Sequence, residues 1–177
     1  MQIPAQIDRY LTGWERRLVW ESGPATLTWL MTGPGGEQRY LKTAPADAAV
    51  PLRAEAARMR WAGAAGLPVP PVLAACAAGP AEWLLTRGLA GRSAVDPGLR
   101  ADPERLVPLL AAGLRRFHQA PAGDCPFRFE AELALERVRK RVRAGVVKPD
   151  DMHPEHAHLT PAQALAELER WRWAAGA

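Results

Sequence analysis

Cysteine is scarce in this sequence, and its scarcity argues against a disulfide framework. Only Cys76 and Cys125 occur among the 177 residues, and they lie far apart without the short spacing of a metal site. Small disulfide-stapled proteins carry several cysteines and belong to oxidising compartments. We therefore expect two free thiols, buried or incidental, in a reducing compartment.

Long apolar runs are also missing. The first residues, MQIPAQIDRYLTGWERR, contain no apolar stretch of the length that a signal peptide needs. Charged residues interrupt every later hydrophobic segment well short of a membrane span. These features predict a cytoplasmic protein without a membrane partner.

The excess of positive charge is small and local. The formal net charge is +4, and arginines gather in the segment ERVRKRVRAG. Such a run could attract nucleic acid, but no aromatic residues interleave with it and no known nucleic-acid module surrounds it. We interpret the run as a solvated helix face and keep nucleic acid only as a weak alternative partner.

The first half of the sequence has strand composition with one helical interruption. Hydrophobic residues make up 48% of the chain, which is enough for one domain or two small lobes. Glycine- and proline-containing turns separate short β-branched, aromatic and aliphatic segments. These segments are RRLVW, TLTWLM, RYLKT, LPVPPVLAACA and EWLLTR. Between the third and fourth, Leu52, Ala56 and Met59 recur at helical spacing before Gly66, which predicts one helix that ends there.

The second half has helix signals only. Asp102 followed by proline predicts a helix start, and that helix should run to about His118. A second helix is predicted over 130–144, and Thr160 with Gln163 forms a capping box for a third. We predict an α+β chain with a strand-rich lobe over 1–87, a linker over 88–98 and a helical lobe over 99–177.

Lys42 and Glu55 are the first candidate functional pair. The predicted third strand carries the lysine and the following helix carries the glutamate. A carboxylate that fixes a flexible ammonium makes a phosphate clamp, as in protein kinases. By spacing alone the two are more often unrelated surface charges. The turn ESGPA, with Ser22 and its backbone amides as donors, would cover the phosphates.

Several segments together resemble the aminoglycoside phosphotransferases that modify the 3'-hydroxyl. These segments are YLKTAP, EAARMRWAGAAGLPVPPVL, EWLLTRGLAG, LRRFHQAPAGDCPFRFE and RVRAGVVKPDDMHPEHAHLTPAQALAEL. They occur in the family's order and cover the chain from about Trp14 to Leu168. The resemblance implies a protein-kinase-like fold, with a five-stranded antiparallel N-lobe that holds one helix and a helical C-lobe that is incomplete here.

The resemblance also implies a nucleotide site for ATP with Mg²⁺. Lys42 resembles the lysine that contacts the α- and β-phosphates, and Glu55 resembles its orienting partner. Tyr40 falls where some members stack an aromatic ring on adenine, although a strand tyrosine is otherwise usually a core residue. Arg87 and Leu89 fall at the hinge positions that bond adenine through backbone atoms.

Acidic residues near the C-terminal end are the candidates for the drug site. Asp151 lies where the family has an acidic residue facing the antibiotic, and Glu155 is a second candidate, although His153 and Pro154 interrupt a run that is more acidic in the family. Carboxylates suit a substrate that carries several ammonium groups. The histidines of HPEHAH are interpreted as surface residues, because a fourth metal ligand is not evident.

The sequence departs from the family in its catalytic residues. The family's His-Gly-Asp loop with its asparagine, and a later metal-binding aspartate, have no counterpart in these 177 residues. The last residues, ERWRWAAGA, fall about where the segment leading into that loop belongs. We therefore expect an N-terminal portion truncated before the catalytic loop, which lacks catalytic and metal-binding residues and is inactive alone.

Three functions are compatible with these observations. The favoured one is aminoglycoside O-phosphotransfer, in which the γ-phosphoryl of ATP moves to a drug hydroxyl and confers antibiotic resistance. The second is another small-molecule kinase of the same superfamily. The third is a non-catalytic remnant that binds a nucleotide or a protein.

Overall fold

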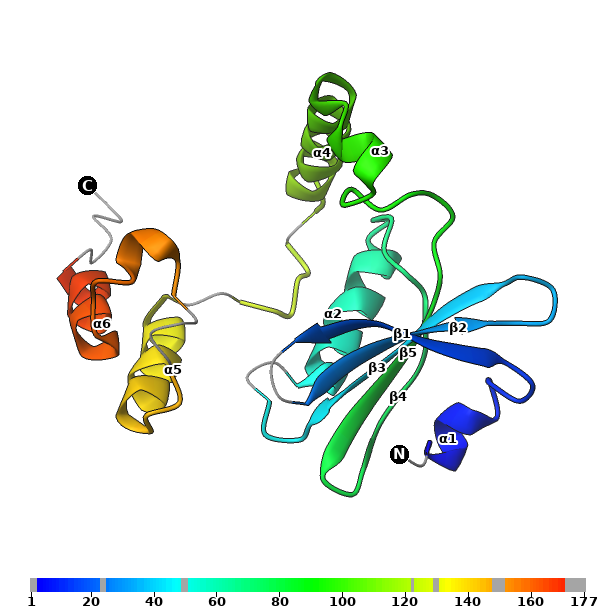
Figure 1. The fold of residues 1–177 in the computed structure, drawn as a ribbon, viewed down its shortest axis with the longest axis horizontal. Helices are drawn as coiled ribbons and strands as arrows, with labels where there is room; N and C mark the ends of the chain where they lie inside the picture. The colour runs from blue at the N-terminus through cyan, green and yellow to red at the C-terminus, as the bar shows by residue number, and fades with distance from the viewer. Residues whose placement is uncertain are drawn as a thin grey trace. The chain divides into compact units, whose positions relative to one another are not determined.

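A computed structural model describes residues 3–22, 25–48, 51–121, 123–128, 131–147 and 152–170. The chain divides into two compact units, Met1–Cys125 and Pro126–Ala177. The first unit holds the sheet and the second holds helices (Figure 1). The predicted lobe boundaries at 87 and 99 differ from this division and stay a prediction.

The first unit is built on one five-stranded sheet in the order β1-β2-β3-β5-β4, and every neighbouring pair is antiparallel. The strands are β1 (Glu15–Ser22), β2 (Thr26–Thr32), β3 (Gln38–Pro45), β4 (Val72–Ala78) and β5 (Ala81–Arg87). Helix α2 carries the chain from β3 to the far edge of the sheet. The tight β4–β5 turn then brings β5 back beside β3. The five predicted strands are confirmed.

Helix α2 (Leu52–Ala64) ends in a motif that depends on glycine. The Gly66 N–H donates to the Gly63 carbonyl, and the Leu67 N–H donates to the Ala62 carbonyl, both at 3.0 Å. This Schellman arrangement needs a left-handed residue, and Gly66 supplies it with φ of 78°. The predicted helix stop is therefore confirmed.

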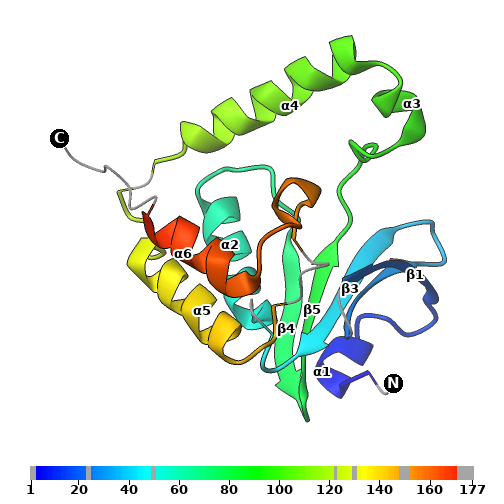
Figure 2. The same cartoon turned by 60° about the vertical axis from the view of Figure 1, so that its left-hand side comes forward.

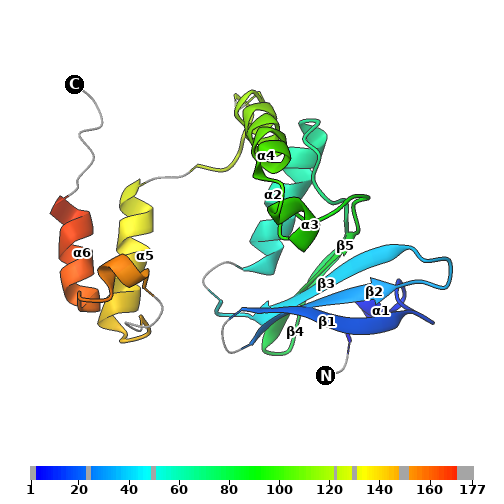
Figure 3. The same cartoon turned by 45° about the horizontal axis from the view of Figure 1, so that its top comes forward.

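The two faces of the sheet are packed differently. Helix α2 packs on one face, and a short helix, α1 (Ala5–Asp8), packs against the other (Figure 3). The cluster under α2 contains Ala44, Leu52, Ala56 and Leu84. The opposite cluster contains Ile7, Leu11, Met31, Leu41, Trp83 and Leu85. Helix α1 was not predicted; Ile7 lies within it, and Leu11 lies in the turn that follows it.

Two capped helices follow the sheet within the first unit. They are α3 (Pro97–Arg100) and α4 (Pro103–His118). Asp96 and Asp102 each accept a hydrogen bond from a backbone N–H of the first turn, at 2.9 and 3.1 Å. The Asp102 cap is confirmed. Helix α3 begins inside the predicted linker 88–98, and Asp96 before proline gives it the same helix-start signature.

The second unit contains α5 (Ala131–Arg143), the 3-10 helix η2 (Pro154–His156) and α6 (Pro161–Arg170). Helices α5 and α6 lie side by side (Figure 2), and Arg139 Nε contacts Glu169 Oε1 at 2.7 Å. The hydrogen bond from Arg139 to Glu169 raises the pKa of the guanidinium, so this arginine of the basic run holds two helices together.

The capping box of α6 is present as predicted. Gln163 Oε1 accepts a hydrogen bond from the Thr160 N–H at 2.8 Å, and Thr160 Oγ1 accepts one from the Gln163 N–H at 3.2 Å. Each side chain satisfies a backbone donor that the helix leaves without a partner. The helix-only composition of the second half is thus confirmed for its described residues.

The predicted absence of disulfides can also be compared with the structure. Cys76 and Cys125 are both partly buried thiols. Burial raises the pKa of the Cys76 thiol, which makes it a poor nucleophile. Within the described part of the chain, every helix is too short or too polar to cross a bilayer.

Candidate functional site

A pocket of about 420 Å³ lies between the sheet and α2 in the first unit. Its lining residues are Trp20, Ser22, Thr26, Thr28, Tyr40, Lys42, Glu55, Met59, Pro70, Leu84 and Thr86. Four of the predicted nucleotide-binding residues are among them, namely Ser22, Tyr40, Lys42 and Glu55. The pocket is therefore the candidate functional site.

Strand register explains why the lining residues meet. Thr28 pairs with Lys42 across β2 and β3, and Lys42 pairs with Leu84 across β3 and β5. Side chains opposite one another point to the same face of a sheet, and so do residues two apart on one strand. Thr28 lies opposite Lys42, and Thr86 lies opposite Tyr40. Once Lys42 was chosen, this alternation could therefore have predicted both threonines.

Trp20 reaches the pocket through an irregularity in β1. Leu18 pairs with Trp29 but Trp20 pairs with Thr28, so one extra residue is inserted between them. This bulge turns Trp20 to the face of Thr28, opposite to that of Leu18. Strict alternation from Leu18 would place both side chains on one face, which is why sequence reasoning did not find Trp20.

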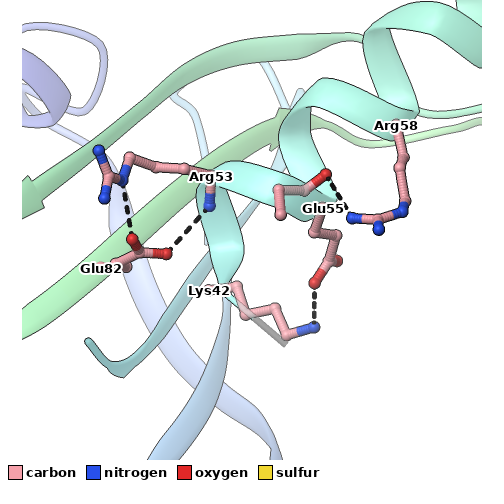
Figure 4. A network of polar contacts seen from close by, with 6 residues as sticks. Lys42, Arg53, Glu55, Arg58 and Glu82 are labelled. Atoms are coloured by element: carbon pink, nitrogen blue, oxygen red, sulfur yellow. Dashed lines mark hydrogen bonds and ion pairs between the residues drawn. The ribbon is translucent and has the colours of Figure 1, made fainter. Parts of the chain in front are cut away.

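Lys42 and Glu55 form the predicted contact. Lys42 Nζ lies 2.8 Å from Glu55 Oε2, and the two side chains are 33% and 30% exposed (Figure 4). An ion pair with this exposure contributes only about 0.2–1 kcal/mol to stability, so its main effect is to orient the ammonium. An ammonium has three donors, and the contact with Glu55 uses one of them. The other two N–H groups can donate hydrogen bonds to anionic oxygens of a ligand.

Tyr40 completes the chemistry of the pocket. It lies two residues before Lys42 on the same face of β3, which separates their Cα atoms by about 7 Å. Its side chain is 37% exposed, so the ring is not a core residue. A flat ring and a held cation at this separation suit a ligand that combines a planar base with phosphates.

The N-terminus of α2 is held by a residue of β5. Glu82, which is 2% exposed, accepts the Arg53 backbone N–H at 3.1 Å and Arg53 Nε at 2.7 Å (Figure 4). Burial is the largest single influence and acts to raise the pKa of Glu82. The hydrogen bonds and charge of Arg53, with a backbone bond from Leu52, together lower it. Sequence reasoning missed Glu82, although a lone carboxylate in an apolar strand was a signal.

The two predicted hinge residues lie outside the lining of this pocket as far as the structure describes it. Arg87 ends β5, and its N–H donates to the Pro71 carbonyl at 2.9 Å. Leu89 follows and is 50% exposed. Gly88 approaches Gln38 so closely that a Cβ atom would lie 2.9 Å from the Gln38 carbonyl oxygen, so only glycine fits there.

The predicted drug-site residues are only partly described. Asp151 lies outside the described residues, as do Gly23 and Pro24 of the phosphate-covering turn. Glu155 lies in the second unit, 79% exposed, with Oε2 3.7 Å from His153 Nδ1. In the described residues, groups of three or more possible metal ligands do not occur.

A second hollow belongs to the second unit alone. It measures about 560 Å³ and its lining is mostly apolar. The lining residues are Met152, His153, His156, Leu159, Ala164, Glu167 and Leu168. Glu155 is absent from this set of described residues, so the structure does not join the predicted drug-site carboxylate to this hollow.

Comparison with known proteins identifies relatives of this chain. A family model described as the phosphotransferase enzyme family matches residues 8–177. An aminoglycoside 3'-phosphotransferase from Streptomyces fradiae is 35% identical over 129 residues, which are 73% of this chain and 48% of that protein. The chain thus spans about half the length of this relative.

Solved structures give the same relationship. An aminoglycoside 3'-phosphotransferase of type VIII superposes with a TM-score of 0.81 and 28% identity, covering 97% of this chain and 66% of the other. An aminoglycoside phosphotransferase from Streptomyces rimosus, in complex with ADP and streptomycin, gives a TM-score of 0.66 at 28% identity, covering 95% of this chain and 62% of that one.

These likenesses confirm the predicted fold class, an α+β protein-kinase-like chain with a five-stranded antiparallel sheet and helices. The relatives found by sequence and by structure are aminoglycoside phosphotransferases. Because the family match spans nearly all of the 177 residues, the chain belongs to the phosphotransferase enzyme family.

Proposed function

We propose that the chain is the nucleotide-binding part of an ATP-dependent aminoglycoside phosphotransferase. The reaction of the whole protein would transfer the γ-phosphoryl of ATP to a drug hydroxyl. The observation that carries this proposal is the Lys42–Glu55 contact of 2.8 Å inside a pocket that also holds Tyr40. The relative that binds ADP and streptomycin supports both substrate classes.

Each residue of the pocket has a role in this proposal. Lys42 binds oxygens of the α- and β-phosphates, and Glu55 fixes the position of the Lys42 ammonium. Tyr40 stacks on the adenine ring, and Ser22 donates to a phosphate from the end of β1. At the hinge, the Arg87 carbonyl and the Leu89 N–H would bond the adenine edge.

Mg²⁺ belongs to the proposal only through the family. Phosphoryl transfer in kinases uses Mg²⁺ to neutralise the charge that develops on the phosphates. In the described residues of this chain, groups of three or more possible metal ligands do not occur. We therefore assign no residue of this chain to the metal.

Binding of adenine by Tyr40 gives the test of the nucleotide site. Tyr40→Ala should weaken ATP and adenosine binding by the same factor, because the ring contacts the base that both ligands share. Loss of base stacking costs about 1–3 kcal/mol, or roughly five- to a hundredfold in affinity. Isothermal titration calorimetry on the 177-residue chain measures both affinities.

Tyr40→Phe is the matched control, because it keeps the ring and removes only the hydroxyl. It should bind both ligands as the unsubstituted chain does. Unchanged affinities in Tyr40→Ala would show that the base lies elsewhere.

Asp151 gives the test of the drug site in a full-length protein that contains this chain. Asp151→Asn should weaken aminoglycoside binding, and more strongly at low salt, because the attraction between a carboxylate and an ammonium is screened by ions. The affinity for ATP should stay the same. Equal losses for drug and ATP would indicate a folding defect instead of a lost drug contact.

A further inference from the structure

We propose that Glu82 is a positioning residue for the Lys42–Glu55 pair. From β5 it caps the N-terminus of α2, and the position of that helix end decides where Glu55 lies. The functional meaning of this inference rests on the proposed role of Lys42 and Glu55 in nucleotide binding.

The start of α2 lacks a cap of its own. Its N-cap residue is Pro51, which makes no side-chain hydrogen bond to the helix. The first N–H groups of a helix have no partner within the helix, and a buried helix end needs another acceptor. Glu82 supplies it, accepting from the Arg53 N–H at 3.1 Å and from the Leu52 backbone. The negative charge also suits the positive end of the helix dipole.

The side chain of Arg53 reinforces this cap. Its Nε contacts Glu82 Oε1 at 2.7 Å, while Oε2 is engaged by the backbone (Figure 4). Both carboxylate oxygens are therefore bonded, and the group is 2% exposed. A carboxylate this deeply buried is costly to leave unpaired, so the helix end cannot shift without a large loss. The first turn of α2 is held at a defined place on β5.

The same helical turn that Glu82 holds also carries Glu55. In the sheet, Ala44 pairs with Glu82 and Lys42 pairs with Leu84, so Glu82 lies two residues along the strands from the row of Lys42. Arg53 and Glu55 are likewise two residues apart in the helix. Figure 4 shows both contacts arising from the start of α2, one directed to β5 and the other to β3.

Unequal burial decides which of the two contacts sets the geometry. The Lys42–Glu55 pair is about one-third exposed and binds weakly, whereas Glu82 is buried and makes charge-assisted bonds. The exposed Lys42–Glu55 contact is therefore too weak to fix the position of α2, whereas the buried contacts of Glu82 are strong enough to do so. Loss of the Glu82 charge should loosen the first turn and withdraw Glu55 from Lys42.

Chemical labelling of lysine amines tests this inference without a nucleotide. The chain has three lysines, Lys42, Lys140 and Lys148. Acetic anhydride must reach Nζ to react, and the contact with Glu55 holds that atom against the helix and shields it, so the ion pair slows labelling. Lys140 is exposed in the second unit and serves as the internal reference. Mass spectrometry gives the rate of Lys42 relative to Lys140.

We expect Glu82→Gln to raise the relative labelling rate of Lys42 about 1.4- to fivefold, the range set by an ion pair of this exposure. Glu55→Gln should raise the labelling rate by the same factor. The double variant Glu82→Gln/Glu55→Gln should give no further increase, because both substitutions break the same Lys42–Glu55 contact. Adding Pro51→Asp to Glu82→Gln should lower the rate again, since an aspartate N-cap restores the helix start.

Hydrogen exchange separates positioning from general loss of structure. Under the labelling conditions, Glu82→Gln should speed exchange in the first turn of α2 while the amides of β3 and β5 stay protected. An unchanged Lys42 rate would overturn the inference and leave Glu82 as a stabilising cap only. Opening of the helix and the sheet together, or failure of Pro51→Asp to restore slow labelling, would also overturn it.

The same labelling reaction reports separately on the proposed function. MgATP should protect Lys42 in the unsubstituted chain and leave Lys140 labelled at its usual rate. Absence of protection would contradict nucleotide binding by Lys42, yet the effect of Glu82→Gln on Lys42 without nucleotide would still decide whether Glu82 positions the pair.

Discussion

Purified by itself and supplied with MgATP and kanamycin, the 177-residue chain should form no detectable phosphorylated drug. Phosphoryl transfer depends on positioning and on compensation of the charge that develops on the phosphates. Lys42 can hold phosphate oxygens, but the sequence has no His-Gly-Asp loop, and the described residues include no cluster of metal ligands. We therefore expect the acceptor hydroxyl to lack the base that this loop supplies in the family. We expect a rate several orders of magnitude below that of a complete enzyme.

Mass spectrometry of the drug after incubation measures this rate. The positive control is a chimera in which the corresponding C-terminal half of the Streptomyces fradiae relative follows this chain. Turnover by the 177-residue chain near the rate of the chimera would contradict the expectation. The catalytic carboxylate would then have to be sought among residues such as Asp124 or Asp150.

Glu82→Ala should lower the free energy of unfolding of the first unit by about 2–5 kcal/mol at neutral pH. The substitution removes the cap of α2, which is worth about 0.5–2 kcal/mol, and charge-assisted bonds worth about 1.5–3 kcal/mol. Native-state hydrogen exchange of the β5 amides measures this free energy. Glu15→Ala is the control, because Glu15 is exposed on β1 and should change stability by less than about 0.5 kcal/mol.

The stability that Glu82 contributes should also depend on pH in a defined direction. Its pKa is lowered in the folded state by Arg53 and by the helix N-terminus. A lowered pKa stabilises the fold above the pKa of an unfolded glutamate, about 4.3, and this contribution is lost as the pH falls through the folded value. The free energy of unfolding of the unsubstituted chain should therefore decrease as the pH is lowered below about 4. In Glu82→Gln, the part of this decrease that comes from protonation of Glu82 should be absent. Identical acid slopes for both chains would contradict this assignment.

Local sequence signals gave much of the fold. The helix end at Gly66 and the helix start at Asp102 could be predicted because each depends mainly on one residue, a left-handed glycine or a capping carboxylate. Short β-branched, aromatic and aliphatic segments between glycine- and proline-containing turns indicated the five strands. The short helices α1 and α3 were missed because four-residue segments offer too little periodicity to distinguish them from turns.

Fewer residues of the candidate site than of the fold could be predicted from the sequence. The contact of Lys42 with Glu55 was expected from the family resemblance, since spacing alone could not distinguish a pair from two surface charges. Trp20 depends on a bulge, and bulges arise from pairing between strands, which the local sequence does not encode. Glu82 caps a helix that lies far from it in the chain. Such a cap becomes visible only when β5 and α2 are placed together.

Calorimetry with two ligands tests the central claim, that Lys42 binds nucleotide phosphates in the pocket beneath α2. Lys42→Met keeps the length of the side chain and removes its charge, and adenosine keeps the base and removes the phosphates. We predict that Lys42→Met weakens ATP binding by about ten- to a hundredfold, the value of a charge-assisted contact, and leaves adenosine binding unchanged. Equal ATP affinities for the unsubstituted chain and Lys42→Met would contradict the claim.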